Sequence, residues 1–377
     1  MNTFWGGAIA IAAGIFLIRN VGRYPGVEKA AAIIPGFSVT FGLLITAFLV
    51  LRLDYSRWVL GGAYLSAVVI FYLGYSHVSG RKDLTIGVLP SGTNTQELMS
   101  LAGVRWVRID PKNSYTPNVE AVTADLKGDL PQTWERWIAD VALAGIPVYH
   151  TKHLIESLTG RVELEHLSET SFGTLSPPSA YMVPKHALDR VTAAVALAIL
   201  APLFLLISAL IRIDSGGPAI FRQQRIGFRG KPFIVYKFRT MRNNGGNEPL
   251  NYEDAITVDN DHRITRLGKF LRRTRIDELP QILNVLKGEM SWIGPRPEAA
   301  ILSGWYEEGI PFYRYRHIVR PGITGWAQVF LGHVADIDQV KSKLFYDFYY
   351  IKNFSLWIDI LIAVKTIRIM ISGYGSK

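Results

Sequence analysis

An apolar run of 21 residues without a charged side chain, Val191–Ile211, lies in the middle of the chain. A transmembrane helix needs ~20 such residues, so the run is long enough to span a bilayer. Positive charges lie on both sides of it, Lys185 and Arg190 before and Arg212 after. Because cations favour the cytoplasmic side, this arrangement disfavours crossing. With Pro202 in the middle, we expect a broken, re-entrant helix that returns to the side it entered, and the alternative is an ordinary kinked span.

Three further apolar runs open the chain, Phe4–Ile18, Ala30–Leu51 and Trp58–Tyr75. We interpret them as transmembrane helices, with the first the shortest. Cations follow the first and third runs, at Arg19, Arg23, Lys29, Arg81 and Lys82. The positive-inside rule then places the N-terminus outside and everything after Arg81 in the cytoplasm.

The charge and cysteine content exclude several classes of protein. The chain has no cysteine, which excludes disulfides, thiolate metal sites and cysteine nucleophiles. Its net charge of +10 comes entirely from residues 181–377, which carry 27 Lys and Arg against 17 Asp and Glu. Since this basic half adjoins apolar segments, we expect it to meet an anionic bilayer and phosphate substrates, and we expect no nucleic-acid partner.

Residues 81–171 have the pattern of a small soluble domain. Strands are predicted at Leu84–Leu89, Val104–Ile109 and Pro147–Tyr149, and helices at Asn94–Ala102 and Pro131–Ala144. Alternating strands and helices indicate a parallel α/β unit. The unit has no G-x-G-x-x-G motif, so dinucleotide binding is not expected. His150 and His153 have no evident third ligand, and we interpret them as ordinary surface or core residues.

The segment from Thr274 to Pro297 begins with a predicted short helix. Leu279, Ile282, Leu283 and Leu286 recur at helical spacing and should share one buried face. Pro280 suits the first turn, and Gly288 suits the C-terminus. The helix therefore starts at or just after two adjacent carboxylates, where free backbone N–H groups point outward.

The two carboxylates are Asp277 and Glu278, and their simplest role would be to cap the helix. Their surroundings favour another role. Cations precede them at Arg263, Arg266, Lys269, Arg272, Arg273 and Arg275, and Arg296 follows between two prolines. Carboxylates among cations indicate an anionic, phosphate-bearing substrate with a divalent metal between.

This segment resembles the signature of the bacterial sugar transferases, the monotopic polyprenyl-phosphate hexose-1-phosphate transferases. Three more blocks match in order and spacing, GGPAIFRQQRIG at 216–227, KPFIVYKFRTM at 231–241 and RPGITGWAQV at 320–329. The resemblance extends from Val183 to the C-terminus. One departure is Ala201-Pro202, where the family carries a Ser-Pro break, so a serine-assisted kink is absent.

The resemblance implies an α+β membrane protein built from four parts. Residues 1–80 would form transmembrane helices, 81–171 a degenerate Rossmann-like domain, 172–182 a linker, and 183–377 the monotopic catalytic domain with its re-entrant helix broken at Pro202. Larger members of the family carry such a Rossmann-like domain at this place. A homodimer, if one forms, would use the N-terminal helices or the soluble domain.

The resemblance also implies residue roles. Asp277 would be the nucleophile and Glu278 a metal ligand or proton handler, with both carboxylates holding Mg²⁺. Lys237, Arg239 and Arg296, with Arg275 nearby, would bind the substrate diphosphate. Asp347 matches a further acidic position of the family and would support the metal or Lys237, and the alternative for it is a plain surface charge on a helix.

The implied reaction moves a hexose-1-phosphate from a UDP-sugar to undecaprenyl phosphate through a covalent aspartyl-phosphosugar, releasing UMP. It would take place at the bacterial inner membrane, on the cytoplasmic face, as the first membrane step of exopolysaccharide, capsule or O-antigen synthesis. Larger members often use UDP-glucose or UDP-galactose. Two alternatives stay open, an inactive membrane scaffold for glycan enzymes and a many-span transferase that attacks directly.

Two segments near the C-terminus carry mixed apolar and basic residues. Tyr313–Arg320 interleaves aromatic residues with arginines, which we interpret as a membrane-interface anchor with phosphate contacts. Phe354–Met370 is predicted to be an interfacial amphipathic helix, with packing against the catalytic core as the alternative.

Overall fold

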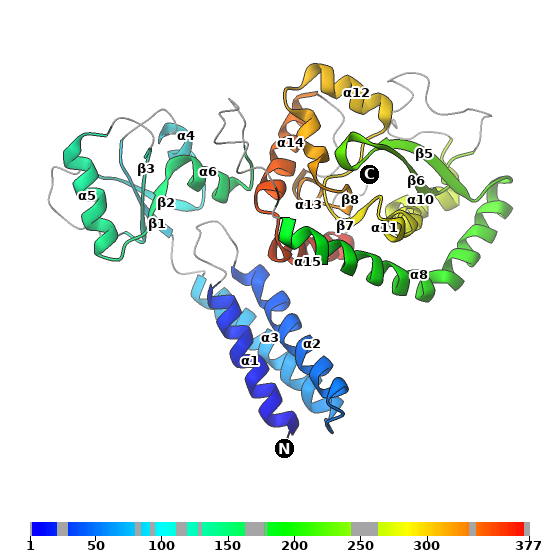
Figure 1. The fold of residues 1–377 in the computed structure, drawn as a ribbon, viewed down its shortest axis with the longest axis horizontal. Helices are drawn as coiled ribbons and strands as arrows, with labels where there is room; N and C mark the ends of the chain where they lie inside the picture. Colours follow the sequence, from blue (N-terminus) through cyan, green and yellow to red (C-terminus); the bar gives the residue numbers. More distant parts are fainter. Residues whose placement is uncertain are drawn as a thin grey trace. The chain divides into compact units, whose positions relative to one another are not determined.

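The computed structural model describes residues 2–20, 29–79, 84–90, 95–110, 119–126, 130–162, 177, 179–242, 263–331 and 337–372. The chain divides into two compact units, Met1–Arg161 and Val162–Lys377 (Figure 1). Most of the predicted linker at 172–182 lies outside the described residues. So do Arg23, Arg81 and Lys82, on which the predicted membrane orientation depends.

Three apolar helices begin the first unit, α1 (Asn2–Asn20), α2 (Lys29–Val50) and α3 (Arg57–Ser79). They pack through a shared core that includes Ile33, Phe37 and Leu60, while large apolar side chains elsewhere on them are exposed. Within the described residues, two stretches are long and apolar enough to cross a membrane, one in α3 (Arg57–Gly74) and one in the second unit. The apolar stretches of α1 and α2 are shorter.

A four-stranded parallel sheet forms the rest of the first unit, in the order β2-β1-β3-β4. Its elements are β1 (Leu84–Val88), α4 (Thr95–Met99), β2 (Val104–Arg108), β3 (Ala121–Ala124), α5 (Gln132–Leu143), β4 (Val148–His150) and α6 (Thr151–Thr159). The predicted parallel sheet is confirmed. The sequence missed β3, which is only four residues long, and α6.

The second unit begins with α8 (Ser179–Ser215), a helix of 37 residues that contains Pro184 and Pro202. Helical structure continues through Pro202, so the expected break in the helix is absent, and α8 is one helix that bends along its length (Figure 1). A proline has no N–H to bond the carbonyl one turn earlier, which permits this bend. One side of α8 packs on the rest of the second unit through Ala193 and Ile207, and large apolar residues on the other side are exposed.

The residues that follow α8 contain two small two-stranded sheets. Strands β5 (Ile220–Ile226) and β6 (Pro232–Phe238) form an antiparallel hairpin, closed by η1 (Phe228–Gly230), and β7 (Ser291–Ile293) pairs in parallel with β8 (Gly322–Thr324). The helices are α10 (Arg266–Arg273), η2 (Ile276–Gln281), α11 (Ile282–Lys287), α12 (Ala300–Gly309), η3 (Tyr313–Ile318), α13 (Trp326–Leu331), α14 (Ile337–Lys352) and α15 (Leu356–Ser372).

The predicted helix after Asp277 is present, but its buried face differs from the prediction. Residues 276–281 form a 3₁₀ turn before the α-helix begins. Because a 3₁₀ helix has 3.0 residues per turn instead of 3.6, the buried face is shifted. Ile282 is buried and Leu279 packs on the same core, as predicted, but Asn284 and Val285 are also fully buried and Leu286 is 37% exposed. Gly288 ends α11 in the left-handed conformation, as predicted.

The C-terminal segments are more buried than predicted. Tyr313 and Arg316 in η3 are 1% and 3% exposed, which rules out the predicted interface anchor for these two side chains, because they face the protein interior. Helix α15 packs on α13, β7 and β8, with Ile358 and Ile362 buried, which is the alternative that the sequence left open for this segment.

Candidate active site

Asp277 and Glu278 occupy the first turn of η2, shortly after α10 ends at Arg273. The chain turns sharply between the two helices at Arg275, whose φ of 59° lies in the left-handed region. This conformation is uncommon for a residue with a side chain and clusters at functional sites. The turn places Glu278 within reach of Lys237 on β6 and of Arg296 in the loop after β7.

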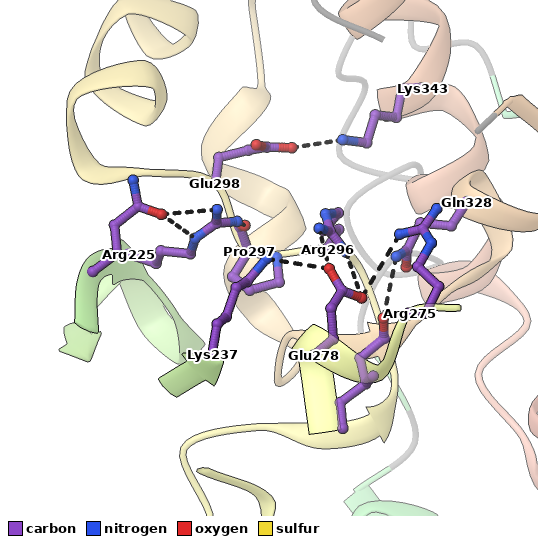
Figure 2. Close-up of polar contacts among 11 residues, drawn as sticks. Arg225, Lys237, Arg275, Glu278, Arg296, Pro297, Glu298, Gln328 and Lys343 are labelled. Atoms are coloured by element: carbon purple, nitrogen blue, oxygen red, sulfur yellow. Dashed lines mark hydrogen bonds and ion pairs between the residues drawn. The ribbon is translucent and has the colours of Figure 1, made fainter. Parts of the chain in front are cut away.

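The carboxylate of Glu278 is surrounded by three cations (Figure 2). Its oxygens lie 2.6 Å from a nitrogen of Arg296, 3.1 Å from the Lys237 amine and 3.7 Å from a nitrogen of Arg275. Burial by itself would favour the protonated form of Glu278, but the charges of Arg296 and Lys237 outweigh it and hold the pKa of this carboxyl well below 4.5. Glu278 is therefore a permanent anion that fixes the geometry of its cations.

Lys237 reaches Glu278 from β6, and Asn284 of α11 holds this strand in place. The Asn284 side chain accepts a hydrogen bond from the Tyr236 N–H at 3.2 Å and donates one to the Ile234 carbonyl at 2.6 Å. It therefore pairs with β6 as a neighbouring strand would. Burial lowers the pKa of Lys237 to about 8, despite the opposing effect of Glu278.

Asp277 differs from Glu278 in having a buried oxygen, Oδ1, with no hydrogen-bond partner. Burial and the neighbouring Glu278 charge raise the pKa of Asp277 above its usual value. A buried acceptor without a partner costs free energy unless a ligand or metal supplies the missing contact. Asp277 is thus the carboxylate of the pair that is available for chemistry.

The described residues fit a magnesium ion held largely by substrate. They contain no cluster of three or more metal-ligating side chains. Mg²⁺ is commonly bound by one or two carboxylates plus substrate phosphates and water, and the partner-free oxygen of Asp277 suits such a site. The second predicted ligand, Glu278, has its oxygens engaged by Arg296 and Lys237.

Two predicted site residues lie in other surroundings. The Arg239 guanidinium is 6% exposed and donates hydrogen bonds to the Ser215 hydroxyl, at 2.9 Å, and to the Gly216 carbonyl. It thus caps the C-terminal end of α8. Asp347 is buried and forms its ion pair with Arg316, at 2.9 Å, rather than with Lys237. The predicted alternative of a surface charge is wrong, because Asp347 is 1% exposed.

The sequence analysis missed a second group of charged residues that adjoins the site. Glu298 lies two residues after Arg296 in the same loop, and its carboxylate lies 2.5 Å from the Lys343 amine (Figure 2). Arg225 of β5 lies close by and donates a hydrogen bond to the Pro297 carbonyl. These residues come from three separate segments of the chain, so no local pattern in the sequence brings them together.

As a whole, the site combines the Asp277 carboxylate, which has a buried oxygen without a hydrogen-bond partner, with a cluster of cations. Arg296 and Glu278 are buried, and Lys237 and Arg275 complete the cluster. Fixed cations of this kind neutralise the oxygens of a phosphate or diphosphate. A carboxylate oxygen beside a bound phosphate can attack phosphorus. This combination supports phosphoryl transfer.

Comparison with known protein families identifies the chain. Residues 180–373 match the model of the family described as bacterial sugar transferase. The chain belongs to the bacterial sugar transferase family. The matched region begins with α8 and contains every residue of the site described above.

Three relatives of this sugar transferase differ in how much they share with it. A protein of Aeromonas hydrophila named UDP-N-acetylgalactosamine-undecaprenyl-phosphate N-acetylgalactosaminephosphotransferase is 44% identical over the whole chain and 88% of its own length. A UDP-glucose:undecaprenyl-phosphate glucose-1-phosphate transferase of Xanthomonas campestris pv. campestris is 44% identical over 52% of the chain and 40% of its own length. An uncharacterized sugar transferase of Haemophilus influenzae is 35% identical over 83% of the chain and 65% of its own length.

Proposed function

We propose that this sugar transferase moves a sugar-1-phosphate from a UDP-sugar to undecaprenyl phosphate, giving a lipid-linked diphosphosugar and UMP. The observation that carries the proposal is the pairing of a cation-bound Glu278 with a partner-free Asp277 oxygen in one buried turn. The names of the relatives from Aeromonas and Xanthomonas describe this class of reaction.

The proposed reaction has two steps with Asp277 as the nucleophile. An Asp277 oxygen attacks the phosphorus that carries the sugar, the bond from this phosphorus to the bridging oxygen breaks, and UMP leaves with that oxygen. A phosphate oxygen of the lipid then attacks the same phosphorus, and the Asp277 carboxylate is released. A covalent intermediate lets a water-soluble donor and a membrane-bound acceptor use one site in turn.

The residues around Asp277 hold the phosphates during both steps. Arg296 and Lys237 already converge on one carboxylate, so they present N–H groups from fixed positions beside the reacting centre. Mg²⁺, held by Asp277 and the substrate phosphates, would neutralise charge on the phosphate oxygens. Glu278 remains an anion and keeps the two cations in place.

An N-acetylated hexosamine is the donor that we propose to test first. The relative that matches the whole chain is named for UDP-N-acetylgalactosamine. The relative named for UDP-glucose matches only about half of the chain. The first proposed pathway is exopolysaccharide synthesis, because a relative of Rhizobium leguminosarum bv. phaseoli is named exopolysaccharide production protein and is 43% identical over 49% of the chain.

The enzyme acts at a membrane in this proposal, with α8 dipping into one leaflet and the catalytic core on the cytoplasmic side. The exposed apolar side of α8 and its basic flanks support this placement. A topology reporter inserted after Gly216 tests it. Activity of a cytoplasmic reporter is expected, and a periplasmic signal would overturn the re-entrant arrangement together with the cytoplasmic site.

The reaction is tested by measuring UMP release from a panel of UDP-sugars, with undecaprenyl phosphate and Mg²⁺, for the wild type and for Asp277→Asn. We expect release from one or two sugars and none from the variant. Without acceptor, intact-protein mass spectrometry should detect a phosphosugar adduct on the wild type alone. Release that survives in Asp277→Asn would overturn the covalent route, and absence of release from any nucleotide sugar would favour the scaffold alternative.

A further inference from the structure

In the loop that carries Arg296, the four consecutive carbonyl groups of residues 295–298 each accept a hydrogen bond from another element. Backbone N–H groups bind two of these carbonyls: Gly322 donates to the Pro295 carbonyl at 3.0 Å, and Ile226 donates to the Glu298 carbonyl at 3.2 Å. Arginine side chains bind the other two: Arg316 Nη2 donates to the Arg296 carbonyl at 2.9 Å, and Arg225 Nη1 donates to the Pro297 carbonyl. Because Pro295 and Pro297 have no N–H, this loop has fewer backbone donors than other loops of its length. Its position therefore depends on groups from other elements, and two of these are arginine side chains.

Of the two arginines that bind the loop, Arg316 is the buried one, and this residue is 3% exposed. Besides the Arg296 carbonyl, its guanidinium donates a hydrogen bond to the Tyr313 hydroxyl at 2.6 Å and forms an ion pair with Asp347 at 2.9 Å. A buried guanidinium needs such a counter-charge to stay in one place. The Asp347 carboxylate supplies it from α14, a helix that follows the active-site loop by about fifty residues of sequence.

Arg316 and three charged neighbours, Asp347, Glu298 and Lys343, form a group of two cations and two anions. Lys343 lies one helical turn before Asp347 on α14 and pairs with Glu298 at 2.5 Å, and Arg316 lies 3.9 Å from the same carboxylate. The two cations and two anions connect α14, η3 and the end of the Arg296 loop. The cations outweigh the effect of burial on Glu298 and hold the pKa of this carboxyl well below its usual value, so the group is ionised.

We propose that Asp347 and Arg316 are positioning residues for Arg296. In this arrangement Asp347 orients Arg316, Arg316 binds the Arg296 carbonyl, and the Arg296 side chain is thereby directed at Glu278 and at the donor diphosphate. The inference rests on the proposed function, because Arg296 needs an exact position only if it binds the donor. It replaces the role that the family resemblance implied for Asp347, support of the metal or of Lys237.

A small displacement of the loop is expected to matter. Arg296 contacts Glu278 at 2.6 Å, and this contact leaves little freedom for the cation that would meet a phosphate oxygen. Misplacement of such a group by about 1 Å can cost ~100-fold in rate. Loss of the Asp347 charge should thus reduce activity without removing any group that touches substrate.

A double-mutant cycle that measures kcat/KM for the donor tests whether Asp347 acts by positioning Arg296. Asp347→Asn keeps the size of the side chain and removes its charge. We expect it to lower kcat/KM by about 10- to 100-fold in the wild-type background and by no more than about twofold in an Arg296→Lys background, because the position of Arg296 is then already lost. An equal loss in both backgrounds would overturn the proposal.

Controls distinguish positioning from instability and from metal binding. Phe348→Leu alters the buried neighbour of Asp347 on α14 and should lower the melting temperature without lowering kcat/KM. A raised Mg²⁺ requirement in Asp347→Asn with an unchanged donor KM would assign Asp347 to the metal and overturn the proposal. Should Asp347→Asn fail to fold, Arg316→Lys enters the same cycle with the same expectations. A wild type without UMP release would instead refute the proposed function itself.

Discussion

Replacing Glu278 by glutamine would leave the cations of the site without their central anion. Glutamine has nearly the same shape, so the packing of η2 is retained. However, Arg296 and Lys237 would face a neutral group, and its NH₂ end can accept no hydrogen bond from them. Two buried positive charges would then repel each other, with the third cation, Arg275, at the edge of the site.

The expected loss of stability in Glu278→Gln follows from the burial of Glu278 and Arg296. Glu278 and Arg296 are 7% and 8% exposed, and removal of one member of such a buried pair costs about 3–5 kcal/mol. The contribution of Arg275 is small, because this side chain is 34% exposed. For a unit of 150–250 residues, 1 kcal/mol corresponds to ~2–4 °C in melting temperature. Glu278→Gln should therefore lower the Tm of the catalytic unit by about 6–20 °C.

Thermal melting of the purified protein in detergent at neutral pH measures this loss. The matched control is Glu307→Gln, which breaks an ion pair with the exposed Arg314 at 3.6 Å and should change the Tm by no more than about 2 °C. Since the pKa of Glu278 is depressed in the folded protein, its stabilising effect is present above pH ~4.5 and is lost as the pH falls below that value. A Tm for Glu278→Gln as close to the wild type as that of the control would refute the reasoning.

Four further outcomes are expected. The kcat/KM for the donor should fall as pH rises through about 8, where Lys237 loses its proton, and should fall again in acid, where the raised pKa of Asp277 leaves the nucleophile protonated. A flat pH–rate profile would contradict both assignments. Asn284→Ala should cost about 2–5 kcal/mol, read from the Tm, because two backbone groups of β6 lose their partners. Gly268→Ala would place a Cβ atom 2.0 Å from the Thr240 carbonyl oxygen and should lower the Tm by several degrees, whereas a neutral result would show that α10 is free to move. Chelation of divalent ions should abolish UMP release and Mg²⁺ should restore it, with the Tm nearly unchanged, because protein cations already neutralise Glu278.

Much of the fold could be predicted because it depends on local patterns. The apolar runs, the alternating elements of the soluble unit and the stop at Gly288 each follow from residues close together in sequence. Which residues of the helix after Asp277 face the protein interior could not be predicted from local patterns. A 3₁₀ turn at 276–281 changes the number of residues per turn, and hydrophobic spacing alone does not reveal it.

The site depends on contacts between residues far apart in sequence, which local patterns cannot supply. The adjacent carboxylates and the cluster of arginines upstream indicated phosphate chemistry. Yet Lys237 and Glu278 are separated by 41 positions, and only the family resemblance associated them. For Asp347 the resemblance implied support of the metal or of Lys237, and it did not indicate the ion pair with Arg316, because one acidic residue on a helix gives no sign of which buried cation it will meet.

Two neighbouring carboxylates with opposite pKa shifts indicate a division of roles within one turn. Glu278 points into the cations and is held ionised, whereas Asp277, one residue earlier, is buried beside that negative charge and has its pKa raised. Environments that separate the pKa values of adjacent titratable groups are typical of sites with two distinct chemical roles. If Glu278 were the nucleophile, its attack would first require the release of Arg296 and Lys237, the groups needed to hold the phosphate. Asp277 can react while those cations stay in place, which is why we assign the covalent step to it.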